Sequence, residues 1–392
     1  MHQRDIAIVG GCGHVGLPLG LVLAQAGHRV RLVDVNEHAI SLINDGKVPF
    51  LERGAEAILK KVVGKDLIAT SGVDAVCKSG IVFFVTGTPV DEHHNPRVQD
   101  VVAVINQYLP CLKPETLVIL RSTVYPDVVA IVDHILKAKF GTSRLAFCPE
   151  RIVQGNGIDE IVRIPQIVSA TSEDAQRGAE ELFLTIAPKV IRLEPEEAEL
   201  AKLITNAWRY LEFAAANQFY MMLESKGIDF YKVFAAIRED YPRAQHLPTA
   251  GLAAGPCLFK DTMQLSAFYK NSYFLGHAAM LINEGLPVFL AEQMESKIGS
   301  LRNKRIAILG MTFKANSDDI RESLAFKLKK ELEIKMAIVL QSDVYLSNTM
   351  SLHDAIEQAD GVILGAPHKE YEGLRISKPV VDCWGMWKRP TP

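Results

Sequence analysis

The sequence predicts an α/β protein with two parallel-sheet domains that are joined by a long central helix and a helical domain. Three observations predict this fold. Short apolar runs that end in glycine or a polar residue alternate with helix-like segments through the first half of the chain. A second alternation begins at Lys304, and a long helix-compatible stretch separates the two. The predicted domains are residues 1–195, 196–300 and 301–392.

The composition is that of a globular protein without a basic bias. With 392 residues, 48% of them hydrophobic and 23% charged, the chain can bury substantial cores. The formal net charge of -3 argues against a nucleic-acid partner, so an anionic ligand needs a local site. We find no cleavable signal and no apolar run near the ~20 residues of a membrane span, which predicts a cytoplasmic protein without a membrane partner.

The six cysteines are scattered through the chain and form no CxxC pair. A chain of this length with so few cysteines lacks the density of a disulfide-stabilised domain. We therefore expect reduced thiols and no metal, in particular no structural zinc. The cysteines are Cys12, Cys77, Cys111, Cys148, Cys257 and Cys383.

The first strand and helix enclose a glycine motif. An apolar strand at 6–9 leads into Gly11, Gly13 and Gly16 in a GxGxxG pattern, and a helix follows at 17–26. The first glycine permits a tight turn, the second lets the backbone approach a pyrophosphate, and the third allows close packing of helix and strand. This unit predicts a dinucleotide site.

A carboxylate in the expected place completes the unit. The second strand, 30–33, ends at Asp34, where an acid can accept from ribose hydroxyls and would repel a 2′-phosphate. NAD is therefore favoured over NADP, and we expect His14 and Val15, inside the glycine motif, to lie beside it. The alternative is a glycine-rich turn that holds no cofactor.

Two further strands end in hydroxyl side chains. The predicted strands at 81–86 and 117–120 lead to Thr88 and Thr123, at the edge where open parallel sheets bind ligands. Both threonines are candidates for contact with cofactor or substrate. A hydroxyl after a strand is also a common helix N-cap, and this alternative stays open.

A strand at 145–148 delivers Glu150 and Arg151 to the same edge. Glu150 can orient a water molecule, or it can simply pair with Arg151.

The central stretch, 196–236, is helix-compatible, with Gly227 as its one expected break. A helix of this length connects domains or forms a dimer seam. Lys202 and Asn206 are four residues apart and therefore share one face. Apolar neighbours indicate that this polar pair faces an enclosed space, whereas a solvated lysine beside an ordinary asparagine is the alternative.

A thiol, an ammonium and a carboxylate lie close together downstream, at Cys257, Lys260 and Asp261. A nucleophilic cysteine in a protein with a dinucleotide site suggests an oxidation through a covalent intermediate. The alternative interpretation of Cys257 is a small buried hydrophobic residue.

The last domain repeats the strand-to-glycine transition at 305–310 without a second GxGxxG motif. Its loop, 311–323, carries Lys314 and Arg321, which suit a diphosphate or a sugar. A solvated charged loop is the alternative. Further strands are predicted at 338–340, 361–364 and 379–381.

Taken in order, these motifs resemble the UDP-glucose/GDP-mannose dehydrogenase family, the nucleotide-sugar 6-dehydrogenases. The resemblance covers nearly the whole chain. It rests on residues 11–19 (GCGHVGLPL), 87–89 (GTP), 122–124 (STV), 149–151 (PER), 199–206 (ELAKLITN), 257–261 (CLFKD) and 310–323 (GMTFKANSDDIRES).

The resemblance implies an N-terminal NAD domain, a helical middle that forms a homodimer and a C-terminal nucleotide-sugar domain. It also implies a four-electron oxidation of a sugar primary alcohol to a carboxylate with two NAD. Cys257 would trap the aldehyde as a thiohemiacetal, which is oxidised to a thioester and cleaved by water. Lys260 or Lys202 would stabilise the thiolate.

The resemblance assigns the other catalytic roles as well. Lys202 and Asn206 would donate to the oxygen on which charge develops. Asp261 and Glu150 would remove a proton or activate water, and Thr123 would place that water. The implied substrate-binding residues are Glu150, Arg151, Lys202, Asn206, Lys260, Lys314 and Arg321, the last of which the resemblance allows to come from the partner subunit.

Two segments disagree on the substrate. Residues 151–156 are similar to the UDP-N-acetylhexosamine branch, whereas Pro256 and the Lys260-Asp261 pair are similar to the UDP-glucose and GDP-mannose branches. We favour a UDP-sugar and leave its sugar open between N-acetylhexosamine and glucose. The last domain is also short between 333 and 343, where contacts to the base are expected.

Two rival functions remain. A two-electron dehydrogenase of the 6-phosphogluconate or 3-hydroxyisobutyrate type also pairs a dinucleotide domain with a helical Lys-and-Asn site, but it would not need Cys257. A non-catalytic NAD-binding protein would need none of the catalytic side chains.

Overall fold

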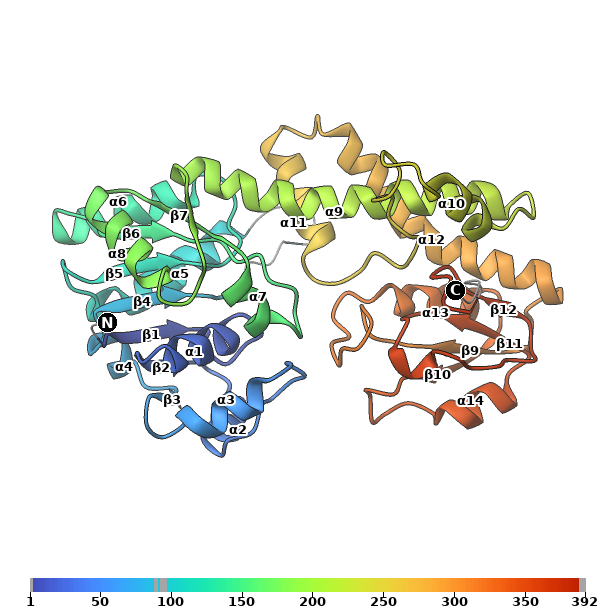
Figure 1. Cartoon of the computed structure of the whole chain (residues 1–392), viewed down its shortest axis with the longest axis horizontal. Coiled ribbons are helices and arrows are strands. Elements are labelled where there is room, and N and C mark those ends of the chain that lie inside the picture. The colour runs from blue at the N-terminus through green and yellow to red at the C-terminus, as the bar shows by residue number, and fades with distance from the viewer. Residues whose placement is uncertain (1–2, 88–90, 92–96, 388–392) are drawn as a thin grey trace. The chain divides into compact units, whose positions relative to one another are not determined.

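A computed structural model describes residues 3–87, 91 and 97–387. It divides the chain into two compact units, residues 1–204 and 205–392 (Figure 1). We call them the first and the second unit and describe each by itself. Thr88, a predicted contact residue, lies outside the described residues.

The first unit is built on one eight-stranded sheet with the order β3-β2-β1-β4-β5-β6-β7-β8. All neighbouring strands are parallel except β6 and β7. The order of the first six positions is that of a Rossmann domain, which confirms the predicted class. The strands are β1 (Asp5–Val9), β2 (Arg29–Val33), β3 (Leu67–Thr70), β4 (Ile81–Phe84), β5 (Leu117–Leu120), β6 (Leu145–Phe147), β7 (Gln166–Ala170) and β8 (Val190–Arg192).

Helices cover both faces of this sheet. Ile6 and Ile8 of β1 pack with α1, α2, α3, α7 and α8 on one face, whereas Ala7 and Val9 pack with α4, α5 and α6 on the other. The period of two along a strand buried on both faces explains its continuous apolar sequence. The helices are α1 (Gly16–Gln25), α2 (Glu37–Asn44), α3 (Ala55–Val62), α4 (Asp74–Cys77), α5 (Val98–Tyr108), η1 (Leu109–Cys111), α6 (Val128–Phe140), α7 (Gly157–Arg163) and α8 (Glu173–Phe183).

The long central helix is α9 (Pro195–Glu224). It ends three residues before Gly227, which has φ +69°, and α10 (Phe230–Arg238) begins after a cap in which Asp229 accepts from two backbone N–H groups. The predicted break at this glycine is therefore confirmed. Two more helices follow, α11 (Leu258–Phe268) and α12 (Phe274–Ile298).

Helix α12 corrects one expectation. It is long and apolar enough to cross a membrane by length and composition, although the sequence analysis expected no such run. One side of it, with Leu286, Leu290, Ala291 and Met294, is fully buried in the core of the second unit. Burial of this kind is typical of a core helix, whose apolar character comes from packing inside the protein.

The second sheet has four parallel strands, as predicted, and their order is β10-β9-β11-β12. Helices α12 and α13 pack on one face with Ile306 and Ile308, whereas α14 packs on the other with Ala307 and Leu309. The elements are β9 (Arg305–Leu309), α13 (Leu324–Ile334), β10 (Ile338–Ser342), α14 (Leu352–Gln358), β11 (Gly361–Leu364), η2 (Lys369–Tyr371) and β12 (Val380–Val381).

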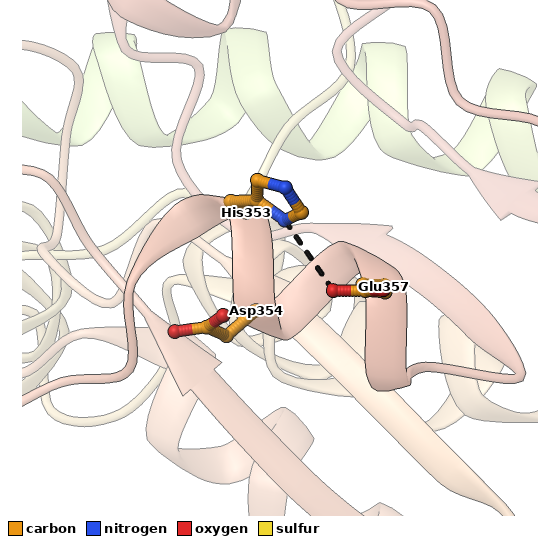
Figure 2. Close-up of side chains that lie close together, drawn as sticks. All are labelled: His353, Asp354 and Glu357. Carbon is orange, nitrogen blue, oxygen red and sulfur yellow. Dashed lines mark ion pairs between the residues drawn. The ribbon is translucent and has the colours of Figure 1, made fainter.

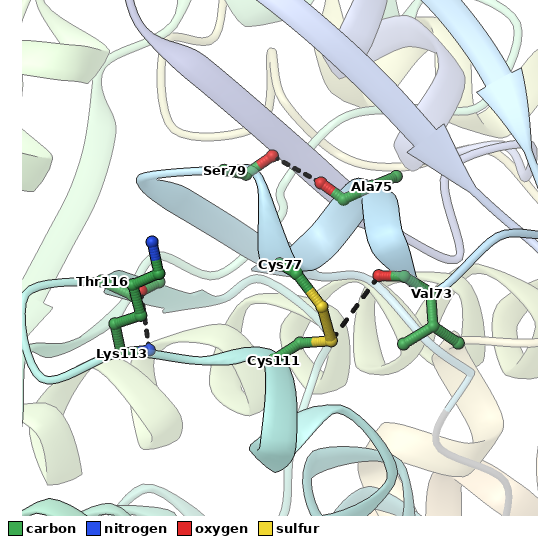
Figure 3. Close-up of a disulfide and its surroundings, with 7 residues drawn as sticks. All are labelled: Val73, Ala75, Cys77, Ser79, Cys111, Lys113 and Thr116. Atoms are coloured by element: carbon green, nitrogen blue, oxygen red, sulfur yellow. Dashed lines mark hydrogen bonds between the residues drawn. A yellow bond between two sulfur atoms is a disulfide. The ribbon is translucent and has the colours of Figure 1, made fainter.

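The cysteine chemistry differs from the expectation of reduced thiols. Cys77, at the end of α4, and Cys111, at the end of η1, form a disulfide with their Cα atoms 4.3 Å apart (Figure 3). The two residues are 34 positions apart, so no local spacing pattern could reveal the pair. They meet because η1 contacts α4 at the side of the sheet. The scattered cysteines therefore give no evidence that the protein works in a reducing compartment.

Candidate active site

The turn after β1 has the geometry of a cradle. A Cβ atom on Gly11 would lie 2.8 Å from Leu32, and one on Gly16 would lie 2.5 Å from the carbonyl oxygen of Gly10, so packing inside the chain requires both glycines. A Cβ atom on Gly13 would meet only that same oxygen, at 3.7 Å. The chain itself therefore leaves space at Gly13, where the backbone of this motif approaches a pyrophosphate.

Asp34 closes the turn and keeps part of its hydrogen-bonding capacity. Its Oδ2 accepts from the N–H of Cys12 at 3.0 Å, and Oδ1 accepts from the N–H groups of Val35 and Asn36. A carboxylate offers about four acceptor positions, and this side chain is only half-buried, so it can still accept from a ribose hydroxyl. Burial and the Asp34 charge raise the pKa of the Cys12 thiol to about 12, so this cysteine stays neutral.

His14 and Val15 complete the loop. The His14 ring packs on Phe50 with 3.9 Å between ring centroids, and Val15 is the residue that immediately precedes α1. Val15 thus marks a helix N-terminus, whose N–H groups favour an anion. The residues present fit NAD at this turn.

The ends of β4 and β5 are joined by a side chain. The Ser122 hydroxyl donates to the carbonyl oxygen of Thr86 at 2.6 Å, which fixes the segment that carries Thr123 next to the one that leads to Thr88. Thr123 is half-buried. It therefore stays a candidate at the carboxyl edge of the first sheet.

Glu150 is paired with a residue that the sequence analysis did not single out. It forms a buried ion pair at 2.6 Å with Arg121, whose guanidinium is fully buried and also donates to Cys148 O and Gln166 Oε1. The other carboxylate oxygen of Glu150 accepts from the backbone N–H groups of Arg151 and Ile152.

Of the two alternatives for Glu150, simple pairing with the Arg151 side chain is therefore not what the structure shows. The guanidinium of Arg151 instead donates to the carbonyl oxygen of Pro165, and burial lowers the pKa of this side chain. The sequence signal for the true partner was an arginine directly after a buried strand. It could not be interpreted, because Arg121 and Glu150 follow two different strands, β5 and β6, and are 29 positions apart in the sequence.

In the second unit, two of the predicted catalytic residues, Asn206 and Asp261, are in contact. The Asn206 amide donates to Asp261 Oδ2 at 2.5 Å, and Lys260 Nζ lies 3.0 Å from Asp261 Oδ1. Asp261 is fully buried between them. The carboxylate thus orients the Asn206 amide. Lys202, near the end of the first unit, lies one turn before Asn206 on α9 and is buried as well.

Cys257 stands at the N-terminus of α11, is exposed and takes part in no disulfide. Its loop packs on the loop of the last domain. Gly255 has φ +100°, donates its N–H to Glu322 O at 3.1 Å, and has no room for a Cβ atom against the Phe313 ring. A helix N-terminus favours a thiolate over a thiol.

Arg321 brings a positive charge to this thiol. Its guanidinium is held by Asp319, which accepts at 2.6–3.0 Å. The pKa of Arg321 is raised, first by that hydrogen bond and, to a smaller extent, by the charge of Cys257. Lys314, on the same loop, lies 5.9 Å from the centroid of the Phe313 ring.

A network of buried amides that the sequence analysis missed supports the Cys257 loop. Asn217 of α9 donates to Gly251 O and accepts from Gly251 N–H, and it also bonds to Asn283 of α12. Asn283 donates in turn to Tyr210 O. The spacing of Asn206 and Asn217, about three helical turns, was the available signal, since it places both amides on one face.

A possible cation cluster lies elsewhere, on α14. Figure 2 shows His353, Asp354 and Glu357, all exposed. His353 and Glu357 form an i,i+4 pair, and Asp354 bonds to the Ser351 hydroxyl that caps the helix. Ordinary helix pairing and capping account for these contacts, and they identify no metal site.

Comparisons with known proteins match three successive parts of the chain to one family. Residues 4–187 match the NAD binding domain of the UDP-glucose/GDP-mannose dehydrogenase family, 196–284 match its central domain, and 307–389 match its UDP binding domain.

Similar proteins cover almost the whole chain. A UDP-N-acetyl-D-mannosamine dehydrogenase of Pyrococcus horikoshii is 28% identical over 94% of this chain and 90% of its own. An NDP-N-acetyl-D-galactosaminuronic acid dehydrogenase of Ralstonia nicotianae is 25% identical over 98% and 96%. The structure of a UDP-glucose dehydrogenase from Pyrobaculum islandicum superposes with a TM-score of 0.90 at 25% identity, over 99% and 95%.

Proposed function

The chain belongs to the UDP-glucose/GDP-mannose dehydrogenase family, and on this premise we propose that it oxidises the primary alcohol of a UDP-sugar to a carboxylate through a covalent intermediate on Cys257. It is an NAD-dependent oxidoreductase. The observation that carries the proposal is the exposed Cys257 thiol at the start of α11, on a loop that is hydrogen-bonded through Gly255 to Glu322, the residue after Arg321.

When bound, NAD would supply the hydride acceptor for the two oxidations. Gly11, Gly13 and Gly16 would receive its pyrophosphate at the start of α1, and Asp34 would bind a ribose hydroxyl. Overall, one alcohol, one water and two NAD⁺ give one carboxylate, two NADH and three protons.

The residues of the second unit would carry the covalent chemistry. The Cys257 thiolate adds to the aldehyde carbon, a C–S bond forms, and the former carbonyl oxygen takes a proton. Oxidation of this thiohemiacetal gives a thioester. Water then breaks the C–S bond, which releases the carboxylate and returns the thiol.

Two side chains on α9 would support these steps. Asn206, oriented by Asp261, and Lys202, one turn earlier, would donate to the oxygen on which negative charge develops. Glu150 would help to place the water together with Thr123. Because Arg121 and two N–H groups already hold its carboxylate, we propose for Glu150 an orienting role instead of proton removal.

The substrate is proposed to be a UDP-N-acetylhexosamine. The match of 307–389 to a UDP binding domain supports the nucleotide, and Lys314, Arg321, Arg151 and Lys260 are the cations proposed for it. The two similar proteins that act on N-acetylated sugars support the sugar. UDP-glucose is the second candidate, favoured by the likeness to the Pyrobaculum islandicum structure and by the Lys260-Asp261 pair.

The protein is further proposed to be a cytoplasmic homodimer. Six of the exposed or half-buried apolar residues on α9 are spaced 4, 3, 4, 4 and 3 positions apart, which forms one stripe suited to a second helix of the same kind. They are Ile204, Trp208, Leu211, Ala215, Phe219 and Met222. Sedimentation equilibrium of the protein and of a Trp208→Glu variant tests the dimer, and we expect the variant to be monomeric.

A substrate panel tests the reaction. UDP-GlcNAc, UDP-ManNAc, UDP-GalNAc, UDP-glucose and GDP-mannose are supplied in turn, and NADH is measured against product. We expect two NADH per sugar and one strongly preferred UDP-sugar. A ratio of one would show the two-electron chemistry of the rival dehydrogenases. No turnover across the panel would indicate a non-catalytic protein.

The variant Cys257→Ser tests the covalent step. We expect carboxylate formation to fall by about a thousandfold or more, because serine is a far weaker nucleophile near neutral pH. Cys383→Ser, which alters a buried thiol of the same unit, is the control and should keep the wild-type rate. Full carboxylate formation by Cys257→Ser would contradict the mechanism.

A further inference from the structure

A buried histidine–aspartate pair lies at the carboxyl edge of the second sheet, and the proposed chemistry does not use it. His368 follows β11 and Asp343 follows β10. Their side chains are fully buried, and His368 Nε2 lies 3.1 Å from Asp343 Oδ2. Buried polar side chains persist where their hydrogen bonds fix a particular geometry.

The hydrogen bonds of the His368 ring define which nitrogen carries the proton in its neutral form. Nδ1 accepts from the backbone N–H of Asn316 at 2.9 Å, so in the neutral ring the proton is on Nε2. This N–H faces Asp343 Oδ2 and, at 3.2 Å, the hydroxyl oxygen of Thr312. The Thr312 hydroxyl in turn donates to Lys314 O at 3.0 Å.

Asn316 is also bound through its side chain by the residue after His368. The N–H of Lys369 donates to Asn316 Oδ1 at 2.9 Å, and Asn316 itself is in the left-handed region with φ +52°. Asp343 meanwhile accepts from the N–H groups of Met311 and Thr312. Both ends of the segment 311–316 are therefore fixed, and Lys314 lies between them.

We infer that His368 is a positioning residue, which holds the 311–316 loop so that Lys314 reaches the anionic part of the nucleotide sugar. This inference rests on the proposed function, because that function gives Lys314 its ligand. Asp343 fixes the first end of the loop and orients the ring. The ring fixes the second end through Asn316. Loss of the Nδ1 contact would release the lysine without unfolding the sheet.

Two substitutions separate the ring's two contacts. In His368→Gln, the side-chain amide can take the place of Nε2–H toward Asp343, but nothing accepts from Asn316. In His368→Asn, the amide oxygen can take the place of Nδ1 and accept from Asn316, but the donor to Asp343 is lost. A merely structural role would make both variants alike.

The readouts are steady-state kinetics and the affinity for UDP, measured by calorimetry on the full-length protein. For His368→Gln we expect the KM for the nucleotide sugar and the Kd for UDP to rise about tenfold, with kcat and the KM for NAD unchanged. For His368→Asn we expect both constants within about twofold of wild type, and a lower melting temperature.

Lys314→Ala completes a double-mutant cycle. In this background, His368→Gln should weaken UDP binding no further, because the lysine that it positions is absent. Additive effects, or equal constants for the Gln and Asn variants, would overturn the inference. Because the Kd for UDP needs no turnover, a wild-type protein that binds UDP but oxidises no sugar would refute the proposed function while the His368 test stands.

Discussion

The two sheets repeat one device and use it differently. In the first, Asp34 at the end of β2 accepts from three backbone N–H groups and is half-buried. In the second, Asp343 at the end of β10 occupies the corresponding place and is buried. It accepts from three backbone N–H groups and from His368. One carboxylate keeps room for a hydroxyl, and the other has none.

The difference explains why only one half is predicted to bind a dinucleotide. A ligand can use an acid only if the protein leaves part of its hydrogen-bonding capacity open. In the second sheet, the histidine takes the place that a ribose hydroxyl could occupy in the first. The loop there is fixed by the protein itself, and it carries Lys314 and Arg321, the cations that we propose for the nucleotide sugar.

The largest expected effect comes from loss of the disulfide, and it tests whether the two units are stabilised by different means. The Cys77–Cys111 disulfide closes a 34-residue separation in the first unit, and its loss should cost about 4 kcal/mol of unfolding free energy. All three tryptophans, Trp208, Trp384 and Trp387, lie in the second unit. In urea, Cys111→Ser should therefore move the circular-dichroism transition more than the tryptophan-fluorescence transition.

Reductant supplies the control for this prediction. Dithiothreitol should shift the wild-type transition to that of Cys111→Ser and leave the variant unchanged. Identical wild-type midpoints with and without reductant would argue against the disulfide.

Exchange of each acid for its amide tests the comparison directly. In Asp343→Asn, an amide group that donates hydrogen bonds replaces one carboxylate oxygen and faces the N–H groups that this carboxylate now accepts from. We expect the unfolding free energy from the fluorescence-detected transition to fall by about 3 kcal/mol. Asp34→Asn should cost less stability and raise the KM for NAD about tenfold, because a charged acceptor for the ribose is lost. If Asp343→Asn moved the KM for NAD and Asp34→Asn did not, the assignment of the two halves would be reversed.

The smallest expected effect is on the pH dependence of stability, because the pKa values of a buried carboxyl group in each unit are shifted in opposite directions. Burial raises the pKa of Glu199 to about 7, although Asp127 and Val129 donate to it. Its contribution to stability is therefore present below about 4.5 and is lost as the pH rises through about 7. Glu199→Gln should remove about 2 kcal/mol of this dependence in circular-dichroism melts between pH 4.5 and 8.

Asp343 supplies the contrast for that measurement. Burial alone would raise its pKa, but the hydrogen bonds from His368 and the backbone outweigh burial and lower it. The contribution of Asp343 to stability is present above the ordinary pKa of an aspartate and is lost as the pH falls through the lowered pKa of the folded state. The fluorescence transition should thus weaken only in acid, and a matching loss at neutral pH would contradict the assignment.

Much of the fold could be predicted because its signals are local. The buried strands of both sheets are continuous apolar runs, and the glycine motif, Asp34 and the break at Gly227 depend on residues close in sequence. Strands β3, β7 and β8 were not predicted, since their apolar runs are interrupted by polar or exposed residues. Their pairing is decided by neighbours that are distant in the chain.

The candidate site divides in the same way. Asn206, Cys257 and Asp261 were singled out from the sequence through the family motifs, and the structure brings Asn206 and Asp261 into contact. The Arg121–Glu150 pair, the Asn217 network and the disulfide could not be predicted, because each joins residues that come together only in the folded chain. The roles of the site residues stay predictions until the variants are measured.

One consequence concerns how the protein can be divided for laboratory work. The boundary between the two units, after Ile204, falls inside α9. A cut there would leave residues 195–204 of the helix on one fragment, fewer than the roughly 12 residues that an isolated helix needs. It would also create two charged ends between Lys202 and Asn206. Separately expressed halves should therefore be designed with the whole of α9 on one of them.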